Sequence, residues 1–379
     1  MRAKRTGVRH GDGVDGGESL DDVDDSDDDD SVQTDNLSDY DNEDSSSDFH
    51  VETIDLSSGI ESRPDNRPHI PVMLEETLGL LNLQPGKTYV DATAGAGGHL
   101  LRIASDTGST STVYGIDRDL SAIERLQGLV PDNVKLIHSN YSEIREKLNE
   151  LGVHTIDGGI MADLGVSSMQ LDEAHRGFSF MRNGPLDMRM DQSRGETAEN
   201  LLNTIDERDL ADIIFRYGEE RFARRIARDI VQHRPIKTTG QLSAIVANTL
   251  RKSQKPKYKR DHGEASKHPA TRTFQAIRIA VNQELQCLEK FLEDALSMLA
   301  PGGRLVVLTF HSLEDRLVKQ FLRSAAMSCV CPPRQPLCTC NKKSQLLIIT
   351  RKPLVAGAEE VLANVRSRSA KLRAGQKLD

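Results

Sequence analysis

A glycine-rich turn and two acidic side chains, one just before it and one about 20 residues beyond it, are the residues of this chain best placed to do chemistry. Residues 91–99 read Asp-Ala-Thr-Ala-Gly-Ala-Gly-Gly-His and follow a short apolar segment. Glycines let a backbone bend sharply and approach a ligand, because they lack a Cβ atom. Asp117 ends the next apolar segment, 22 residues after Gly95, a spacing that suits an acid binding the hydroxyls of a ribose. The pattern predicts a site for a ligand that carries an adenosine.

Two features of the same turn indicate which adenosine compound binds. A nicotinamide dinucleotide site needs a third glycine where this chain has Leu100. Asp91 would repel a pyrophosphate, but it suits a cationic ligand such as the sulfonium and amino groups of S-adenosylmethionine. We therefore expect S-adenosylmethionine rather than NAD. The alternative is an ordinary turn between a strand and a helix.

The elements that must position these residues alternate along the chain. Apolar segments predict strands at 88–90, 112–116, 134–137, 156–162, 305–310 and 346–350, with helical segments between them. Such an alternation predicts a mostly parallel sheet covered by helices on both faces. Apolar residues at helical spacing from Val281 to Leu299 predict one long helix.

Charge and composition divide the chain into four parts. Residues 1–67 form an acidic tail, expected to be disordered because it lacks apolar residues. Residues 68–172 and 283–379 are expected to form the two parts of the core, separated by an inserted helical substrate-recognition domain at 173–282. The alternative for the insertion is a bundle that only stabilises the fold. Residues 1–68 carry 21 acidic and 6 basic residues, so the remainder of the chain has a net charge of +6.

Asp163 ends the fourth predicted strand, where methyltransferases that act on amino groups place an acidic motif. The exocyclic amine of a nucleobase is a poor nucleophile, because its lone pair is delocalised into the ring. A carboxylate that accepts an N–H bond of this amine orients the nitrogen and makes it more able to attack a methyl group. Asp163 is thus the expected catalytic residue. The alternatives are a loop cap or a contact with the methyl donor.

Two further residues at strand ends have both a functional and a structural interpretation. Tyr141 follows the third strand, where its ring could stack on an adenine or pack in the core. His311 follows the strand at 305–310, where it could contact the substrate or be a structural histidine.

Basic clusters in the insertion favour a nucleic-acid substrate over a solvated surface. One comprises Arg221, Arg224, Arg225 and Arg228; the other comprises Lys252, Lys255, Lys257, Lys259 and Arg260, with Tyr258 among them. The acidic tail could compete with RNA for these clusters, although a passive extension is the simpler interpretation.

The cysteines and the hydropathy indicate in which cellular compartment the protein works. Cys329, Cys331, Cys338 and Cys340 form two Cys-x-Cys pairs, which could hold one zinc ion or form a reduced hairpin without metal. Five cysteines in a chain of 379 residues fit a reducing cytoplasm. No apolar run approaches the length of a membrane span. We expect a cytoplasmic protein without membrane contact.

Residues 69–372 resemble the RsmH (MraW) family of small-subunit ribosomal RNA cytosine-N4 methyltransferases. The resemblance is carried by the segments 91–99, 163–172, 176–191, 217–227, 267–276 and 310–316. It departs from the family pattern at Ala94 and Val365. The resemblance implies a class I S-adenosylmethionine-dependent methyltransferase fold, a Rossmann-like doubly wound sheet with an inserted helical domain. The donor would be held by Gly97, Gly98, His99, Asp117, Tyr141, Asp163 and Gln170, with no metal in the site.

The resemblance also implies a partner. The substrate would be a cytosine in the decoding region of 16S ribosomal RNA, presented as RNA or in the assembling small ribosomal subunit. Whether the protein forms a homodimer stays open. Two other classes remain: a methyltransferase acting on protein or small molecules, and an RNA-binding protein without catalysis. The basic insertion argues against the first class, and the intact Asp91, Gly97 and Asp117 argue against the second.

Overall fold

The structure is a computed structural model that describes residues 71–253, 268–332, 335 and 337–379. Two predicted features lie outside these residues. One is the acidic segment 1–67, and the other is the part of the second basic cluster from Lys255 to Arg260. The expectations for both stay predictions.

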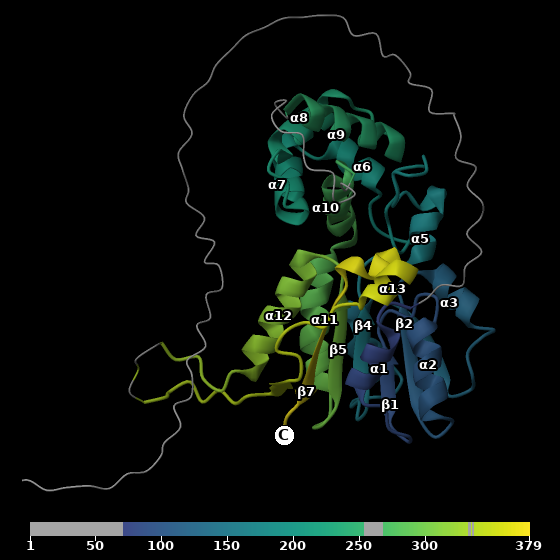
Figure 1. The fold of residues 1–379 in the computed structure, drawn as a ribbon, viewed down its shortest axis with the longest axis vertical. Helices are drawn as coiled ribbons and strands as arrows, with labels where there is room; N and C mark the ends of the chain where they lie inside the picture. The colour runs from purple at the N-terminus through teal and green to yellow at the C-terminus, as the bar shows by residue number, and fades with distance from the viewer. Residues whose placement is uncertain (1–70, 254–267, 333–334, 336) are drawn as a thin grey trace, which may run out of the picture. The chain divides into compact units, whose positions relative to one another are not determined.

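The predicted apolar strands pair side by side (Figure 1). The described residues form a seven-stranded sheet in the order β3-β2-β1-β4-β5-β7-β6. Its strands are β1 (Thr88–Asp91), β2 (Thr112–Asp117), β3 (Val134–His138), β4 (Gly159–Asp163), β5 (Arg304–Thr309), β6 (Leu346–Ile348) and β7 (Lys371–Lys377). Neighbouring strands from β3 to β5 are parallel, while β7 runs antiparallel to β5 and β6. This arrangement confirms the doubly wound α/β fold expected of a class I methyltransferase.

Helices cover both faces of the sheet, as the alternation predicted. The helices are α1 (Leu74–Leu81), α2 (Gly98–Thr107), α3 (Leu120–Leu126), α4 (Ile144–Glu150), α5 (Ser168–Asp172), α6 (Ala198–Thr204), α7 (Glu207–Gly218), α8 (Ala223–Gln232), α9 (Thr239–Ser253), α10 (Thr271–Asn282), α11 (Glu284–Met298), α12 (Ser312–Ala326) and α13 (Ala358–Ala363), with short 3-10 turns η1 (Tyr141–Glu143), η2 (Ala174–Arg176) and η3 (Val365–Ser369). Within the described ranges, every helix is too short or too polar to span a bilayer.

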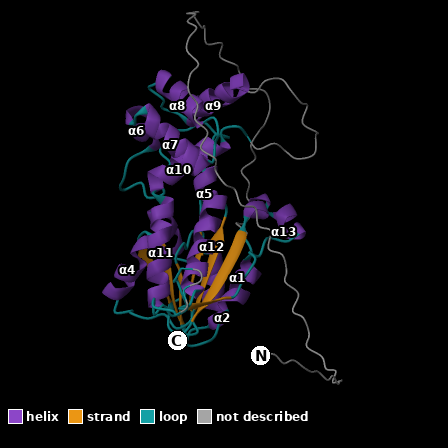
Figure 2. Cartoon of the chain, turned by 90° about the vertical axis from the view of Figure 1, so that its left-hand side faces the viewer, coloured by secondary structure: helices purple, strands orange, loops and turns teal. Residues whose placement is uncertain are grey.

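Alternate residues of each central strand enter two different cores, because successive side chains of a strand point to opposite faces. Leu305 and Val307 of β5 pack with α4, α11 and α12, whereas Val306 and Leu308 pack with α1, α2 and α3. Figure 2 shows α4 and α11 on one side of the strands and α1 and α2 on the other. The two buried faces explain why these strands read as continuous apolar runs.

The segment between β4 and β5 has a core of its own. Helices α6–α10 bury apolar residues against one another, among them Leu210, Ile226 and Phe274. The predicted single helix from Val281 to Leu299 is wrong. It is interrupted at Gln283, whose φ of 50° is left-handed, so that α10 ends at Asn282 and α11 begins at Glu284. The chain turns there from the inserted helices back to the sheet.

Three strands differ from the prediction by more than one residue, and one of them, β6, ends at Ile348 rather than at residue 350. β4 begins at Gly159 rather than at Ile156, which forms an isolated bridge to Leu299. β7 was not predicted at all, because its sequence is basic and lacks an apolar run. It is buried all the same, since Arg373 pairs with Asp315 of α12 at 2.7 Å while Leu372 enters the core.

The strand order reverses between β1 and β4. From β1 the chain proceeds through β2 to β3 on one side, and then crosses to β4 and β5 on the other. Ligands of open α/β sheets bind at such a reversal, in the crevice beyond the carboxyl ends of the strands. The fold therefore places the loops after β1, β2 and β4 around one crevice.

Candidate active site

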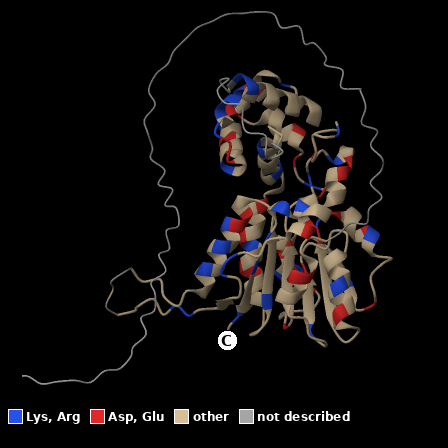
Figure 3. Ribbon diagram, viewed as in Figure 1, with Lys and Arg blue, Asp and Glu red and all other residues tan. Residues whose placement is uncertain are grey.

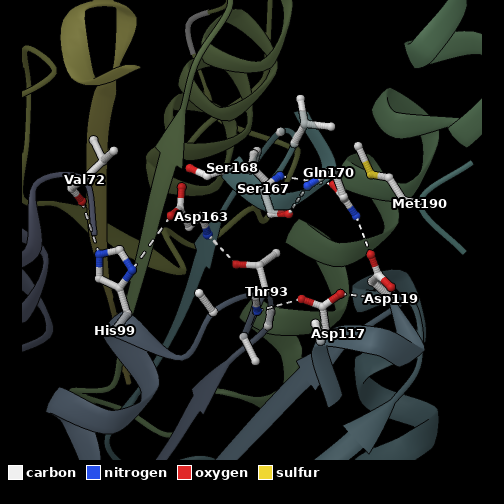
Figure 4. A pocket seen from close by; sticks show the side chains of 18 of the residues that line it. Val72, Thr93, His99, Asp117, Asp119, Asp163, Ser167, Ser168, Gln170 and Met190 are labelled. Carbon is white, nitrogen blue, oxygen red and sulfur yellow. Dashed lines mark hydrogen bonds and ion pairs between the residues drawn. The ribbon is translucent and has the colours of Figure 1, made fainter. Parts of the chain in front are cut away.

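A cavity occupies the point where the strand order reverses (Figure 4). It is lined by the loop after β1, by Asp117 at the end of β2 with Asp119 beyond it, and by residues between Asp163, which ends β4, and Gln170. Six of the seven predicted site residues line it: Gly98, His99, Asp117, Tyr141, Asp163 and Gln170. The seventh, Gly97, lies in the same loop but is not part of the lining.

The glycines of the loop after β1 have separate structural tasks. Gly97 has a φ of 87°, and a Cβ atom there would lie 2.5 Å from Leu126 of α3, so this glycine lets α2 begin close to its neighbour. A Cβ atom on Gly98 would lie 2.2 Å from the ring of Pro71, which lines the cavity. Gly98 thus makes room for the Pro71 ring, and Gly97 both makes room for Leu126 and takes a left-handed φ that favours glycine.

Asp117 holds the glycine-rich loop in place. One carboxylate oxygen accepts a hydrogen bond from the N–H of Gly95 at 2.7 Å, and the other accepts one from the N–H of Asp119 at 2.8 Å. Burial raises the pKa of Asp117, and these two backbone donors work against that rise. Each carboxylate oxygen has a second lone pair, so the group can still accept hydrogen bonds from a ligand in the cavity.

Asp91 lies beneath the loop and not on the cavity surface, contrary to the expectation that it faces a cationic ligand. It is 1% exposed, and it accepts a hydrogen bond from the N–H of Thr93 at 3.0 Å. Burial raises its pKa to about 7, with a further contribution from the charge of Asp117. Asp91 therefore shapes the loop and influences the site through its charge.

Asp163 faces the cavity from the end of β4, with a quarter of its side chain exposed. Its backbone N–H donates to the hydroxyl of Thr93 at 2.6 Å, which joins the loops after β1 and β4. Burial raises the pKa of Asp163 well above its usual value, and the nearby charges of Asp91 and Glu314 raise it further. The carboxyl group thus binds a proton more readily than an ordinary aspartate.

His99 orients toward Asp163 from the first turn of α2 (Figure 4). Its Nε2 atom lies 3.2 Å from the carbonyl oxygen of Val72, so this nitrogen carries the proton. The Nδ1 atom then lies 3.8 Å from a carboxylate oxygen of Asp163. The ring is buried, and it connects the segment at Val72 with the acid of the cavity.

Tyr141 lies both in the core and at the cavity, the two positions that the sequence left open. It belongs to the core, where its ring meets Phe291 edge to face at a centroid distance of 5.4 Å, and it also lines the cavity. Its hydroxyl donates to the carbonyl oxygen of Glu284 at 3.3 Å, and burial raises its pKa. The ring is therefore held rigidly at the cavity wall.

A buried ion pair ties the start of the insertion to the tip of β2. Asp119 accepts hydrogen bonds from Gln170 at 2.8 Å and from Arg176 at 2.7 Å. Arg176 is 2% exposed and also donates to the carbonyl oxygen of Met190 at 2.9 Å. Gln170 is thus committed to protein partners. Its predicted contact with the donor would come from the part of the side chain that faces the cavity.

A second acidic cluster on the cavity wall was missed by the sequence reasoning. Glu284 and Glu314 line the cavity and are nearly fully buried. Arg278 at the end of α10 forms two hydrogen bonds with Glu284, both of 2.8 Å, and His311 lies 3.0 Å from Glu314. Burial would raise the pKa of Glu314, but His311 and Arg278 lower it below its usual value. His311 itself does not line the cavity, which supports its structural interpretation.

Three arginines of α8, and a fourth just before it, are exposed on the insertion. Arg221, Arg224, Arg225 and Arg228 are exposed, whereas Ala223, Ile226, Ala227 and Ile230 of the same segment are buried. In Figure 3 the ribbon around α8 carries several of the positions coloured for lysine and arginine. Only Lys252 of the second basic cluster falls among the described residues, and it is exposed.

Comparison with known proteins shows extensive similarity. Residues 66–378 match the model of the MraW methylase family. The chain is 48% identical over 317 residues to the Ribosomal RNA small subunit methyltransferase H of Citrifermentans bemidjiense, covering 82% of this chain and 98% of that protein. It is 47% identical over 315 residues to the protein of that name from Clostridium botulinum, and 45% identical over 316 residues to the one from Clostridioides difficile. Each of these two matches covers 82% of this chain and 99% of the relative.

Proposed function

The chain belongs to the MraW methylase family, and from that premise we propose that it methylates small-subunit ribosomal RNA, with S-adenosylmethionine as the methyl donor. The acceptor is the exocyclic N4 atom of a cytosine in the decoding region of 16S ribosomal RNA. The observation that carries the proposal is the cavity itself, which brings Asp117 and Asp163 from two different strand ends to one crevice.

The residues around the cavity fit the donor. Asp117 has lone pairs free for the ribose hydroxyls, and Tyr141 offers a fixed aromatic surface beside it. Gly98 lets the backbone come close, and His99 and Gln170 complete the walls. Gly97 does not line the cavity, but it lets the loop after β1 pack against Leu126 of α3. S-adenosylmethionine supplies an electrophilic methyl group when it is bound there.

Asp163 prepares the acceptor amine. Its carboxylate accepts an N–H bond of the cytosine amine, which fixes the direction of the nitrogen lone pair and raises its electron density. The donor held in the cavity would supply the methyl group and keep the electron pair of its carbon–sulfur bond, and the methylated nitrogen would then have a proton to lose. The raised pKa of Asp163 suits it to take that proton. Thr93 holds the backbone of Asp163 in position, and the ring of His99 lies beside its carboxyl group.

The basic face of α8 supports an RNA substrate. Arg224, Arg225 and Arg228 of α8, with Arg221 just before it, are exposed and can contact phosphates of a nucleic acid, whose binding energy comes largely from such contacts. The insertion begins directly after the segment from Asp163 to Gln170, so it is joined to the cavity wall. A substrate held by the insertion would reach the methyl group from that side.

The test compares Asp163→Asn with Asp157→Asn. Asp163 ends β4, whereas Asp157 lies two residues before β4 begins, is exposed and accepts a hydrogen bond from the N–H of Thr88. The substrate is the small ribosomal subunit from a strain that lacks this methyltransferase, and methylated nucleosides are identified by mass spectrometry. The wild type and Asp157→Asn should form N4-methylcytidine, while Asp163→Asn should turn over at least about 10²-fold more slowly at saturating donor.

Two results would contradict the proposal. One is methylation by the wild type at a position other than the cytosine amine. The other is full turnover by Asp163→Asn with a loss confined to donor affinity, which would restrict Asp163 to the donor site. Calorimetric titration with S-adenosylmethionine separates the two effects of the substitution.

A further inference from the structure

Four cysteine side chains converge on one point in the loop between α12 and β6, apart from the cavity. The Sγ atom of Cys338 lies 3.5 Å from those of Cys329 and Cys340 and 3.8 Å from that of Cys331. Cys329 and Cys340 are 3.8 Å apart, and all four sulfur atoms lie within 4.8 Å of one another. In Figure 1 this loop extends to the left of α12 and β7. None of its cysteines lines the cavity.

These distances are those of four thiolates around one metal ion. Zinc binds thiolates at about 2.3 Å, and a regular tetrahedron of that radius has edges of about 3.8 Å. A cluster of several irons would hold its cysteines farther apart, because the iron and sulfide core lies between them. A disulfide needs sulfur atoms at about 2.05 Å, and the cysteines here are free. The geometry is that of a mononuclear site with four sulfur ligands.

Backbone amides support the charge of the sulfur atoms. Three backbone N–H groups donate to these sulfur atoms, each at 3.4 Å. That of Val330 donates to Cys340, that of Cys331 to Cys329, and that of Thr339 to Cys331. Hydrogen bonds of this kind orient thiolate ligands and stabilise their negative charge at metal sites. The two Cys-x-Cys turns thus present both their sulfur atoms and their amides to the same point.

The loop has little else to hold it in shape. Its ends are joined where Gln345 donates to the carbonyl oxygen of Ala325 at 2.9 Å. Among the described residues from 327 to 345, none is buried, and Val330 and Leu337 are more than half exposed. Cysteine is among the residues most often found in protein interiors, so four of them on an exposed loop need a reason. A segment without an apolar core requires a cross-link or a metal to stay ordered.

We propose that this chain binds one zinc ion through the thiolates of Cys329, Cys331, Cys338 and Cys340. Four protein ligands leave no open position, so the zinc is structural and fixes the loop between α12 and β6. Tetrahedral sites with four sulfur ligands select zinc or iron among the biological metals.

The test measures metal in the full chain, produced in zinc-supplied cells and purified under reducing conditions without chelator. Elemental analysis by mass spectrometry should find about one zinc per chain. A Cys338→Ser and Cys340→Ser double variant should contain nearly none. The control is Cys287→Ser, which removes the fifth cysteine, in α11, and should retain the zinc. Circular dichroism melting should show that the double variant keeps the fold of the sheet.

A second measurement reports on the loop itself. Trypsin should cut the double variant after Lys342 or Lys343 much faster than the wild type, because loss of the metal frees the loop. Addition of zinc after chelation should restore the resistance of the wild type and leave the double variant unprotected. Zinc no higher in the wild type than in the double variant would overturn the proposal. So would iron at one per chain, or intact-mass evidence that the four cysteines are paired as disulfides.

Discussion

Substitution of Asp119 by asparagine is the sharpest test of how the insertion is attached to the sheet. One carboxylate oxygen of Asp119 caps α3 by accepting from Ser121, a task that an asparagine performs equally well. The other oxygen accepts from Gln170 and Arg176. In Asp119→Asn the amide nitrogen would meet these two donors, and Arg176 would keep its charge without a carboxylate partner.

The size of the effect follows from burial. The side chains of Arg176 and Asp119 are 2% and 9% exposed, so water cannot replace the lost partner. Breaking such a buried pair costs about 3–5 kcal/mol. The matched control is Asp172→Asn, because Asp172 pairs with Arg366 at 3.1 Å but the two side chains are 60% and 45% exposed. An exposed pair contributes at most about 1 kcal/mol.

Urea unfolding of the three proteins measures the difference. Asp119→Asn should lower the transition midpoint with little change in slope, and Asp172→Asn should leave it nearly unchanged. The effect should also depend on pH. Burial would raise the pKa of Asp119, but its bonds with Ser121, Gln170 and Arg176 lower it below the usual value. The stability that this carboxylate provides is therefore present at neutral pH, and it is lost as the pH falls below about 4.

Equal midpoints for Asp119→Asn and Asp172→Asn at pH 7 would refute the reasoning. They would mean that the Arg176 charge is solvated in the folded protein. A loss that persists unchanged at pH 3 would also contradict it, because the lost interaction would then not involve an ionised carboxylate.

Three further predictions concern the loop after β1. Asp117→Ala should weaken S-adenosylmethionine binding in calorimetry by on the order of 1.5–3 kcal/mol for each bond lost; unchanged affinity in a folded variant would remove Asp117 from the ribose site. Burial raises the pKa of Asp91 to about 7 in the folded protein. The free energy of unfolding should therefore be highest below about pH 4 and fall by up to about 4 kcal/mol between about pH 4 and 7, where Asp91 ionises more readily in the unfolded chain. Asp91→Asn should flatten this pH dependence in urea unfolding, and identical pH profiles would disprove the ionisation of Asp91. Gly98→Ala should displace Pro71 and weaken donor binding, whereas Gly79→Ala, whose added Cβ meets nothing within 4 Å, should not; equal affinities would contradict the packing argument.

The parallel part of the sheet was predictable from sequence because its strands are buried on both faces. Apolar runs marked β1 to β5 within a few residues, and acids directly after the runs marked Asp117 and Asp163. Strand ends meet at one edge of a parallel sheet, so residues from separate strands could be assigned to one crevice without knowing side-chain positions.

Features that depend on distant partners could not be predicted in this way. β7 is basic, and within it Arg373 is buried in an ion pair with Asp315 while Leu372 enters the core. Glu284 and Glu314 look like surface acids of helices, and they are buried because Arg278 and His311 pair with them. Asp91 looked like a ligand contact, yet the turn of the chain places it behind the loop. In each case the deciding interaction joins residues whose proximity no local pattern records.

The placement of the insertion also has a consequence for how quickly the sheet can form. Ile160 of β4 pairs with Leu305 of β5, although residues 164–303 separate the two strands. Closing a long flexible segment costs entropy, by about 0.6 kcal/mol for each doubling of its length, and contacts between distant residues slow folding. Helices α6–α10 share an apolar core and can collapse first, which shortens the flexible chain between the strands. The inserted helices would then act as a folding aid for the central pair of strands, and substitutions in their core should slow refolding of the whole sheet.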